Sequence, residues 1–395
     1  MNTKKLNRTM GYVCMLLFCL SAGVKAQVTK PAIGKVLNLA EQQYKSYLKQ
    51  YPDAALYPRS VNKDGSIRLV KSKDWTSGFF GGNLWYLFYL TGKGKWKNEA
   101  IRYTETLENE KYNKTTHDLG FVLYNTFYKA YQTTHNNRYK EVLLEASKSL
   151  SSRFNPKVGA IRSWDFKPFK YPVIVDNLMN LEMLLWAAKA SGDSSFYRIA
   201  VSHADVDLKY RFRPDHSTYH VLDFNPENGE LIKKQTFQGY ADGSCWARGQ
   251  AWAIYAYTFL YRETRDPKYL LQAEAAADYF LSQTDLAQDP IPFRDFNDPE
   301  IPNVSKDASA AAVAASGLLE LSTYVGTKTN YYDRAQAILS ALCTDEYLAK
   351  AGTNQYFLLK HSTGHRPHQD EVDVPLIYAD YYFLEALYRY QHYKK

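Results

Sequence analysis

A two-helix unit recurs along the chain and limits what it can fold into. Each copy has an apolar helix that ends in tyrosine or alanine, a short polar turn, and a second helix that opens with tyrosine. Five copies and a half-copy follow one another, at residues 84–100, 127–143, 184–200, 257–273, 318–335 and 383–395. The first helix is apolar almost all round, as a buried helix must be, whereas the second is amphipathic. The pattern predicts an all-α fold, an (α/α)6 barrel of six helical hairpins with an inner and an outer ring.

The repeat also indicates the domain organisation. It runs without a break from about residue 33 to 392, so residues 27–395 are predicted to form a single domain, although length alone would suggest two. One stretch departs from the helical pattern, because Tyr219–Phe224 reads as a strand and Asn228-Gly229 follows as a turn. We expect a short β-hairpin there, near the mouth of the barrel.

Residues 1–26 are interpreted as a cleaved secretory signal. Basic residues precede an apolar run over 12–20, and Val24-Lys25-Ala26 forms a small-residue cleavage site. The apolar run is too short to be a stable membrane anchor, and no later segment is long and apolar enough to cross a membrane. We therefore expect export, to the periplasm if the source is a Gram-negative bacterium, and no membrane partner.

Charge and cysteine content exclude several classes of function. Without the signal the chain has 45 basic and 41 acidic residues, a formal net charge of about +4 that gives no case for nucleic acid as a partner. Two cysteines remain, Cys245 and Cys343, which either form one disulfide or stay as buried thiols. The nine histidines show no metal-ligating spacing and no phosphate-binding loop is present, so we expect no metal and no cofactor.

Polar and aromatic residues gather where the chain enters each predicted inner helix. Asp176 ends an extended stretch and opens an apolar helix, and Asp118 stands in the same position before another. An aspartate there is most often a helix N-cap, and these residues alone favour that interpretation. N-caps do not account for the large side chains beside the acids: Trp75, His117, Arg248 and Trp252. We therefore predict a pocket at this end of the barrel.

Seven motifs run in order from about residue 70 to 390: WTSGFFGGNLWYL, HDLGF, VDNLMNL, YHV, QGYADGSCWARGQAW, DASAAAVAASGLLEL and DYYFLEAL. Together they resemble the unsaturated glucuronyl hydrolases, which are family 88 glycoside hydrolases. That family removes the 4,5-unsaturated uronic acid that polysaccharide lyases leave at the non-reducing end of their products. The resemblance implies an unsaturated uronate-containing oligosaccharide as the partner, with glycosaminoglycan disaccharides favoured, and it independently implies the (α/α)6 barrel.

The resemblance also implies roles for single residues. Asp176 stands at the position of the family's general acid/base, and Asp118 at that of its partner carboxylate. Pocket and sugar contacts are implied for the other matches: His117, His220, Trp75, Trp252, Gln238 and Arg248. Arg248 suits the uronate carboxylate because a guanidinium donates paired hydrogen bonds, although an ion pair within its own loop explains the residue alone equally well. Phe237 stands where some relatives have a polar histidine and is given no role.

The chemistry that the resemblance implies is hydration of a vinyl ether. A protonated Asp176 delivers a proton to C4 of the sugar, and its carboxylate then takes a proton from the water that attacks C5. This requires a carboxyl group whose pKa is raised, by burial among aromatic residues and by a neighbouring anion such as Asp118. The basic loop 361–368 is interpreted either as a solvated loop or as a wall of the next sugar subsite.

Other functions stay open at this point. An unsaturated rhamnogalacturonyl hydrolase performs the same chemistry on pectin products, and the motifs do not separate the two activities securely. A sugar epimerase would need two histidines on opposite faces of the ring, where this chain has acids. A non-catalytic glycan-binding protein would use the aromatic mouth alone. The 34 tyrosines fit sugar faces and a tyrosine-rich core equally well, and we expect a monomer or a weak homo-oligomer.

Overall fold

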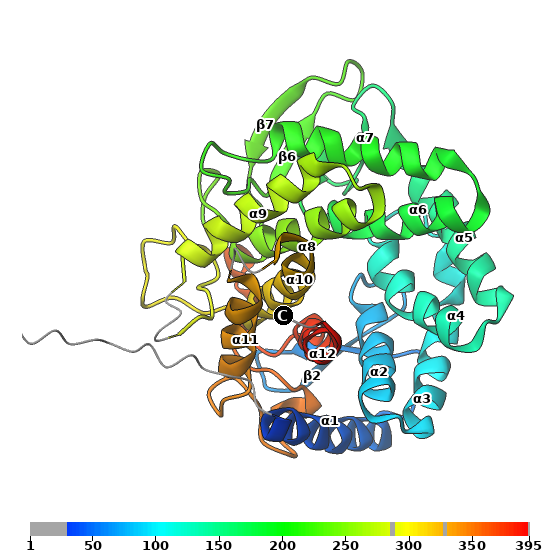
Figure 1. The fold of residues 1–395 in the computed structure, drawn as a ribbon, viewed down its shortest axis with the longest axis vertical. Coiled ribbons are helices and arrows are strands. Elements are labelled where there is room, and N and C mark those ends of the chain that lie inside the picture. The colour runs from blue at the N-terminus through cyan, green and yellow to red at the C-terminus, as the bar shows by residue number, and fades with distance from the viewer. Residues whose placement is uncertain (1–29, 285–288, 327–329, 394–395) are drawn as a thin grey trace, which may run out of the picture.

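The helices are arranged as two concentric rings, which Figure 1 shows in a view along the barrel. The computed structural model describes residues 30–284, 289–326 and 330–393, and the predicted signal over residues 1–26 lies outside them. The predicted all-α (α/α)6 barrel is confirmed, with short strands at one end. The chain contacts described below come from these residues.

Six helical segments form the inner ring. In chain order they are α2 (Ser77–Thr91), η2 (Gly120–Tyr128) continued by α4 (Lys129–Thr134), α6 (Asn177–Ser191), α8 (Ala247–Thr264), α10 (Ala308–Val325) and α12 (Ile377–His392). Each packs against the next, and α12 returns to α2, so the ring is closed. In α10 every residue from Ala308 to Leu321 is buried, as its apolar sequence requires. The expectation that no later segment is long and apolar enough to cross a membrane is wrong for α10, which passes that test by length and composition. However, 78% of it is buried inside the barrel, as in a core helix.

Six outer helices cover this ring. They are α1 (Lys30–Gln50), α3 (Gly94–Glu105), α5 (Asn137–Ser151), α7 (Ser194–Tyr210), α9 (Pro267–Ser282) and α11 (Tyr331–Leu342). The repeated polar turns of the sequence make the connections. Gly192, with φ 78°, ends α6, and the side chain of Asp193 then accepts a hydrogen bond from the backbone of Ser195 to cap α7. A left-handed glycine followed by an aspartate N-cap is a standard way to stop one helix and start another.

The sixth pair is assembled from the two ends of the described chain. The helix α1 takes the outer position, packing Tyr44 and Tyr47 against Phe80 of α2. It also donates hydrogen bonds from Gln43 Nε2 to the carbonyl oxygens of Thr353 (2.9 Å) and Phe357 (3.2 Å), in the segment that leads to α12. The ring is therefore complete only when the first and last helices are both in place.

Short strands surround the end of the barrel where the chain enters the inner helices. The predicted hairpin is confirmed as β6 (Val221–Phe224) and β7 (Leu231–Gln235), and β5 (Pro172–Ile174) adds a third strand to it. Three further antiparallel pairs were not predicted: β1 (Tyr57–Val61) with β2 (Ile67–Val70), β3 (Phe154–Asn155) with β4 (Ala160–Ile161), and β8 (Ser362–His365) with β9 (Asp370–Val374). The 3-10 segments η1 (Glu108–Tyr112), η4 (Asn354–Tyr356) and η5 (Arg366–His368) complete the connections.

The two cysteines of the described residues do not form a disulfide. Cys245 is buried beside Thr218 and Gln250, and Cys343 is half-buried at the end of α11. The sequence left open a disulfide or two free thiols, and the structure has the free thiols.

Candidate active site

A pocket of about 190 Å³ opens where the chain enters the inner helices. Six of the eight predicted site residues line it: Trp75, His117, Asp118, Asp176, Gln238 and Arg248. The seventh, His220, lies directly beside Asp176, and the eighth, Trp252, lies beneath the pocket. Residues from four inner-helix entrances are therefore brought to one place, as the barrel geometry predicts.

The position of Asp176 is fixed by the strand that precedes α6. Strand β5 pairs with β6 so that the backbone N–H of Val175 donates to the carbonyl of His220 at 3.1 Å. Asp176 then occupies the N-cap position of α6, but its side chain makes no capping hydrogen bond. The residue is 9% exposed, and Oδ2 has no hydrogen-bond partner among the described residues. The N-cap interpretation is therefore wrong for this side chain.

Burial sets the protonation of Asp176. It raises the pKa of this carboxyl from 3.8 to about 7, with Arg248 acting to lower the pKa and Asp118 acting to raise it. A carboxyl group with a pKa near 7 is protonated in a large fraction of molecules at neutral pH and is still easily ionised. These are the properties of a general acid that must also act as a base.

The imidazole of His220 presents an N–H to that carboxyl. Its Nδ1 accepts hydrogen bonds from the backbone N–H groups of Phe237 (3.1 Å) and Gln238 (3.2 Å), so the proton of the neutral ring is on Nε2. Burial lowers the pKa of His220 well below 6.5, which keeps the ring neutral. The Nε2 atom lies 3.7 Å from Asp176 Oδ2, and neither atom has another partner in the described structure.

His117 and Asp118 form a second pair on the opposite side of the pocket. Nδ1 of His117 lies 3.0 Å from the carbonyl oxygen of Ser163 and therefore carries a proton. Nε2 lies 3.1 Å from Asp118 Oδ1, and Asp118 Oδ2 accepts a hydrogen bond from the Thr116 hydroxyl at 3.0 Å. Burial lowers the pKa of His117 while Asp118 acts to raise it. Because the neutral ring carries its proton on Nδ1, Nε2 has no hydrogen to donate to Asp118, and the Thr116 hydroxyl is the group that orients this carboxylate at the pocket wall.

Arg248 lines the pocket but is already engaged by protein groups. Its NH1 donates to Asp307 Oδ2 (2.7 Å) and to the carbonyl of Thr363 (2.6 Å), and its NH2 donates to the carbonyl of Gly364 (2.9 Å). The structural ion pair suggested as one interpretation of this residue is present, although its partner comes from the entrance of α10 and not from the same loop. Asp307 is a true N-cap, since its Oδ1 accepts from the backbone of Ser309. The guanidinium supplies a fixed positive charge near Asp176.

The two predicted tryptophans lie at different depths. Trp75 forms part of the pocket wall and contacts Phe121 and Tyr378. Trp252 is fully buried, and the structure places it below the pocket and not on its wall. It belongs to an aromatic layer across the barrel, in which ring contacts run from Phe79 to Phe121, Trp252, Tyr382 and back to Phe79. Trp252 therefore supports the floor of the pocket.

Sequence reasoning missed an aromatic wall beside Gln238. Trp164 and Phe166 stack at 5.1 Å, and Phe237 contacts both rings. Phe237, which was given no role, lines the pocket and also packs edge-on against His365 and His368. The run Trp164 to Phe169 holds three aromatic residues in six positions, which was the available signal. The loop 361–368 thus lies at the pocket, with its strand β8 and segment η5, and is not simply solvated.

An ion pair between distant parts of the chain, Arg59 and Glu371, also lines the active-site pocket. Arg59 on β1 donates to both carboxylate oxygens of Glu371 on β9, at 2.8 and 2.9 Å, and to Asp74 at 2.8 Å. Arg59 and Glu371 both line the pocket. Among the described residues no group of three or more His, Cys, Asp or Glu side chains could hold a metal ion.

Known proteins match the chain over most of its length. Residues 39–394 match the model of the family described as Glycosyl Hydrolase Family 88. A protein of Formosa agariphila named unsaturated glucuronyl hydrolase is 44% identical over 97% of this chain and 96% of its own. A protein of the same name from Bacillus sp. strain GL1 is 32% identical over 91% of this chain and 95% of its own. A crystal structure of an unsaturated glucuronyl hydrolase specific for heparin superposes with a TM-score of 0.90 at 44% identity, covering 92% of this chain and 98% of the other.

Proposed function

The chain belongs to glycosyl hydrolase family 88, and from this premise we propose that it removes the 4,5-unsaturated uronic acid from the non-reducing end of lyase-generated oligosaccharides. The observation that carries the proposal is the carboxyl of Asp176, which is buried, has an unpartnered Oδ2 and has a pKa of about 7. Glycosaminoglycan disaccharides are the favoured substrates, because a relative of 44% identity is described as specific for heparin.

The first step is protonation of the sugar double bond. Protonated Asp176 donates its proton to C4, and positive charge develops at C5 and the ring oxygen. The carboxylate of Asp118 lines the pocket and stabilises this charge electrostatically. The neutral His220 places its Nε2–H against the carboxylate that Asp176 becomes, 3.7 Å away before the reaction.

The second step adds water. The carboxylate of Asp176 accepts a proton from a water molecule as the oxygen attacks C5, which returns Asp176 to its protonated form. The net change is one hydrogen on C4 and one hydroxyl on C5, which makes a hemiketal. The hemiketal opens and releases the rest of the saccharide. Rules that relate carboxylate separation to retention or inversion do not apply, because no displacement occurs at the anomeric carbon.

The neighbouring sugar is proposed to lie against the aromatic wall. Trp164, Phe166 and Phe237 offer flat apolar faces next to Gln238, which suit the faces of a pyranose ring. The side chains of His365 and His368 stack at 4.0 Å beyond Phe237 and mark the outer edge of the same wall. This wall supports a disaccharide as the smallest substrate that contacts the whole site.

The decisive experiment follows the ultraviolet absorbance of the conjugated C4=C5 carboxylate during incubation with unsaturated heparin, chondroitin and hyaluronan disaccharides. Wild type should remove the absorbance, and Asp176→Asn should reduce the rate by at least about 100-fold, as expected for loss of a general acid. Asp165→Asn is the matched control, because this carboxylate is half-exposed, pairs with Arg153 and lies outside the pocket. Asp165→Asn should retain the wild-type rate.

The outcomes separate the remaining functions. Activity only on unsaturated galacturonyl-rhamnose would replace the glycosaminoglycan substrate by a pectin product. Binding of all the disaccharides without loss of absorbance would favour a glycan-binding protein. Near wild-type activity of Asp176→Asn would remove this residue from the acid role.

Export through a cleaved signal is proposed on the sequence of residues 1–26 alone. Expression of the full chain in a Gram-negative host, followed by cell fractionation and mass measurement, tests it. The expected product begins at Gln27 and is found in the periplasmic fraction, whereas an intact Met1 in the cytoplasm would contradict the proposal.

A further inference from the structure

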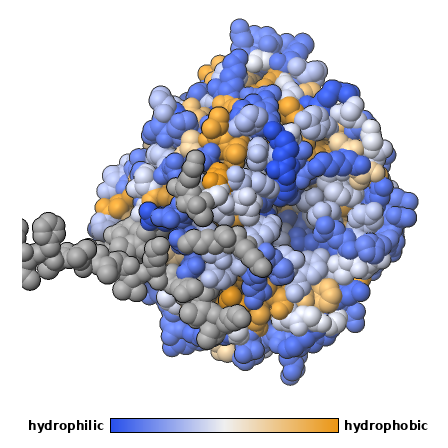
Figure 2. All heavy atoms as spheres, viewed as in Figure 1, coloured by the Kyte–Doolittle hydropathy of each residue, from blue (hydrophilic) through white to orange (hydrophobic). Residues whose placement is uncertain are grey.

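A second cavity, of about 380 Å³, lies at the other end of the barrel. Its walls come from the middle and last turns of the inner helices, whereas the active-site pocket is formed at their beginnings, and the two share no lining residue. The aromatic layer of Phe79, Phe121, Trp252 and Tyr382 separates them. Figure 2 shows this face of the molecule hollowed near its centre, with hydrophilic residues around the hollow.

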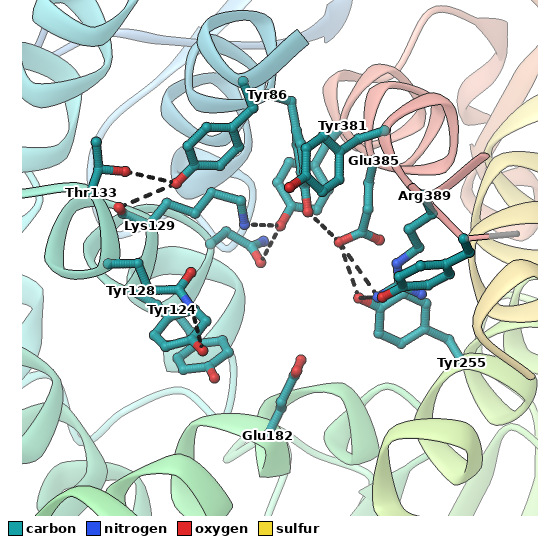
Figure 3. A pocket seen from close by; sticks show the side chains of 15 residues that line it. Tyr86, Tyr124, Tyr128, Lys129, Thr133, Glu182, Tyr255, Tyr381, Glu385 and Arg389 are labelled. Carbon is teal, nitrogen blue, oxygen red and sulfur yellow. Dashed lines mark hydrogen bonds and ion pairs between the residues drawn. The ribbon is translucent and has the colours of Figure 1, made fainter. Parts of the chain in front are cut away.

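Most of the side chains that line this second cavity are tyrosines, so we call it the tyrosine cavity; Figure 3 shows it from close by. Eight of its fifteen lining residues are tyrosines, contributed by α2, η2, α8, α12 and the residue after α12. Tyr124 and Tyr128 stack in parallel with ring centroids 4.5 Å apart and so offer a flat face. Phenol rings that combine an apolar face with a hydroxyl suit a small polyhydroxylated ligand, and about 300 Å³ is where volumes of small-molecule sites begin.

Most charges around the tyrosine cavity are already paired. Glu385 accepts hydrogen bonds from Tyr86 (2.5 Å), Tyr255 (3.2 Å) and Ser316 (2.7 Å). Arg389 pairs with Glu320 at 3.0 Å and donates to Tyr255 at 2.9 Å. These groups fix the shape and charge of the α12 wall and leave few hydrogen-bonding positions there for a ligand.

Two hydrogen-bond donors on the opposite wall are not paired in this way. Lys129 is 8% exposed and donates to Tyr381 OH at 2.8 Å, but no carboxylate of the described residues lies within ion-pair distance of its ammonium. Asn125, one turn earlier and 9% exposed, accepts from the same Tyr381 hydroxyl at 3.0 Å, and its amide Nδ2 has no partner among the described residues. An ammonium and an amide side by side, each with spare N–H groups, match the two oxygens of a carboxylate.

Glu182 supplies the complementary acceptor across the cavity. It projects from α6 into the cavity that Lys129 also lines (Figure 3), and Arg262 engages its Oε1. Its second carboxylate oxygen is therefore available to accept hydroxyl groups. Both Asn125 and Lys129 lie where η2 passes into α4, and η2 is wound as a π-helix, a rare form that is frequent at functional sites.

We propose that the tyrosine cavity is a second binding site, for a small hydroxycarboxylic acid of monosaccharide size. The carboxylate lies on Lys129 and Asn125, and the hydroxyl groups face Glu182 and the tyrosines. A neutral sugar satisfies Glu182 but leaves the two donors unpaired, and a simple carboxylate satisfies only the donors. The site stands on its own residues and does not rest on the reaction proposed above.

Calorimetric titration of D-glucuronate into the whole protein tests the proposal, with D-glucose and propionate as comparison ligands. Glucuronate should bind at least about tenfold more tightly than either, because each comparison ligand leaves buried polar groups unpaired. Asn125→Asp is the sharpest variant: it keeps the acceptor for Tyr381 and places a carboxylate against Lys129, so it should abolish glucuronate binding. Lys129→Met should also abolish it, whereas Lys148→Met, which removes an exposed charge from α5, should not.

Crystals soaked with D-glucuronate locate the bound molecule. Density beside Lys129 and Asn125 supports the proposal, and a soaked cavity without glucuronate overturns it. Equal affinity of wild type and Asn125→Asp also overturns it, since the ligand then lies elsewhere. Both variants should keep the wild-type rate of disaccharide hydrolysis, because neither residue lies in the active-site pocket. The binding measurement therefore fails or succeeds separately from the proposed reaction.

Discussion

Replacing Asp176 by asparagine should abolish activity and at the same time stabilise the fold at alkaline pH. The folded-state pKa of this carboxyl is about 7, above its ordinary value of 3.8, because burial disfavours the charged form. Between these two pKa values the folded state keeps a proton that the unfolded chain releases. The free energy of unfolding of the wild type therefore falls as the pH rises from about 4 to about 7, and the full cost of the buried charge is present above that. Asparagine carries no such cost.

The expected magnitude follows from the pKa difference. One pKa unit corresponds to 1.36 kcal/mol, so the full shift of about three units is worth about 4 kcal/mol. The interval from pH 5 to pH 8 covers the upper two of the three pH units between the unfolded-state and folded-state pKa values. Over this interval the free energy of unfolding of the variant should rise by about 2–3 kcal/mol relative to that of the wild type. Asp380, whose pKa burial also raises to about 7, is present in both proteins and cancels in the comparison.

Urea denaturation of the two proteins at pH 5 and pH 8 measures this difference. The gap in free energy of unfolding between Asp176→Asn and wild type should be larger at pH 8 than at pH 5. Asp165→Asn, with the same chemical change on a half-exposed carboxylate, should show no such pH dependence. An equal gap for Asp176→Asn at both pH values would refute the reasoning, because the carboxyl would then not titrate between them.

Three further predictions concern residues in the pocket and in the structure that supports it. Protonated Asp176 is the active form, so the alkaline limb of the kcat/KM profile is expected near pH 7. Asp118→Asn should move this limb to lower pH, because Asp118 helps to raise the pKa of Asp176. His220→Leu should lower the free energy of unfolding by about 1–3 kcal/mol, measured in urea, because two partly buried backbone N–H groups lose their acceptor. Unchanged stability would contradict this. Gly78→Ala should lower the melting temperature clearly, since its Cβ would overlap the backbone carbonyl oxygens of Phe121 and Val122. Gly94→Ala, with no atom within 4 Å of the added Cβ, should not.

The barrel was predictable from the sequence because its signal is local. Each inner helix has to be apolar on every side, and each turn carries its own helix stop and N-cap, as at Gly192 and Asp193. The short strands were not predictable in the same way, except for β6 and β7. Strands β1 and β9 lie far apart in the sequence, and the contact between Arg59 and Glu371 spans 312 residues. Nothing in either segment alone indicates its partner.

The residues of the candidate site were predictable from the sequence, but how deep each lies in the barrel and which groups hold it were less so. The acids, with His117 beside Asp118, stand at helix entrances, and the barrel brings every entrance to the same end. Trp252 is five residues into α8, so the helix carries it below the pocket into the aromatic layer. Arg248 is held by groups from the α10 entrance and from β8, which are distant in sequence and could not be paired with it beforehand. The π-helical winding of η2, which places Asn125 and Lys129, has no recognised signal in GFVLYNTFY.

Because the first and last helices complete the ring together, a chain that lacks α12 has neither the active-site pocket nor the tyrosine cavity in complete form. A ribosome that stops before residue 377 leaves out the sixteen residues of α12. Such a product lacks Tyr378 from the wall of the active-site pocket, and it lacks Tyr381 and Glu385 from the tyrosine cavity. It also exposes the apolar flanks of α2 and α10, which α12 covers in the finished protein. Copies that lack α12 should therefore be inactive, and their exposed apolar surface should make them sensitive to proteases.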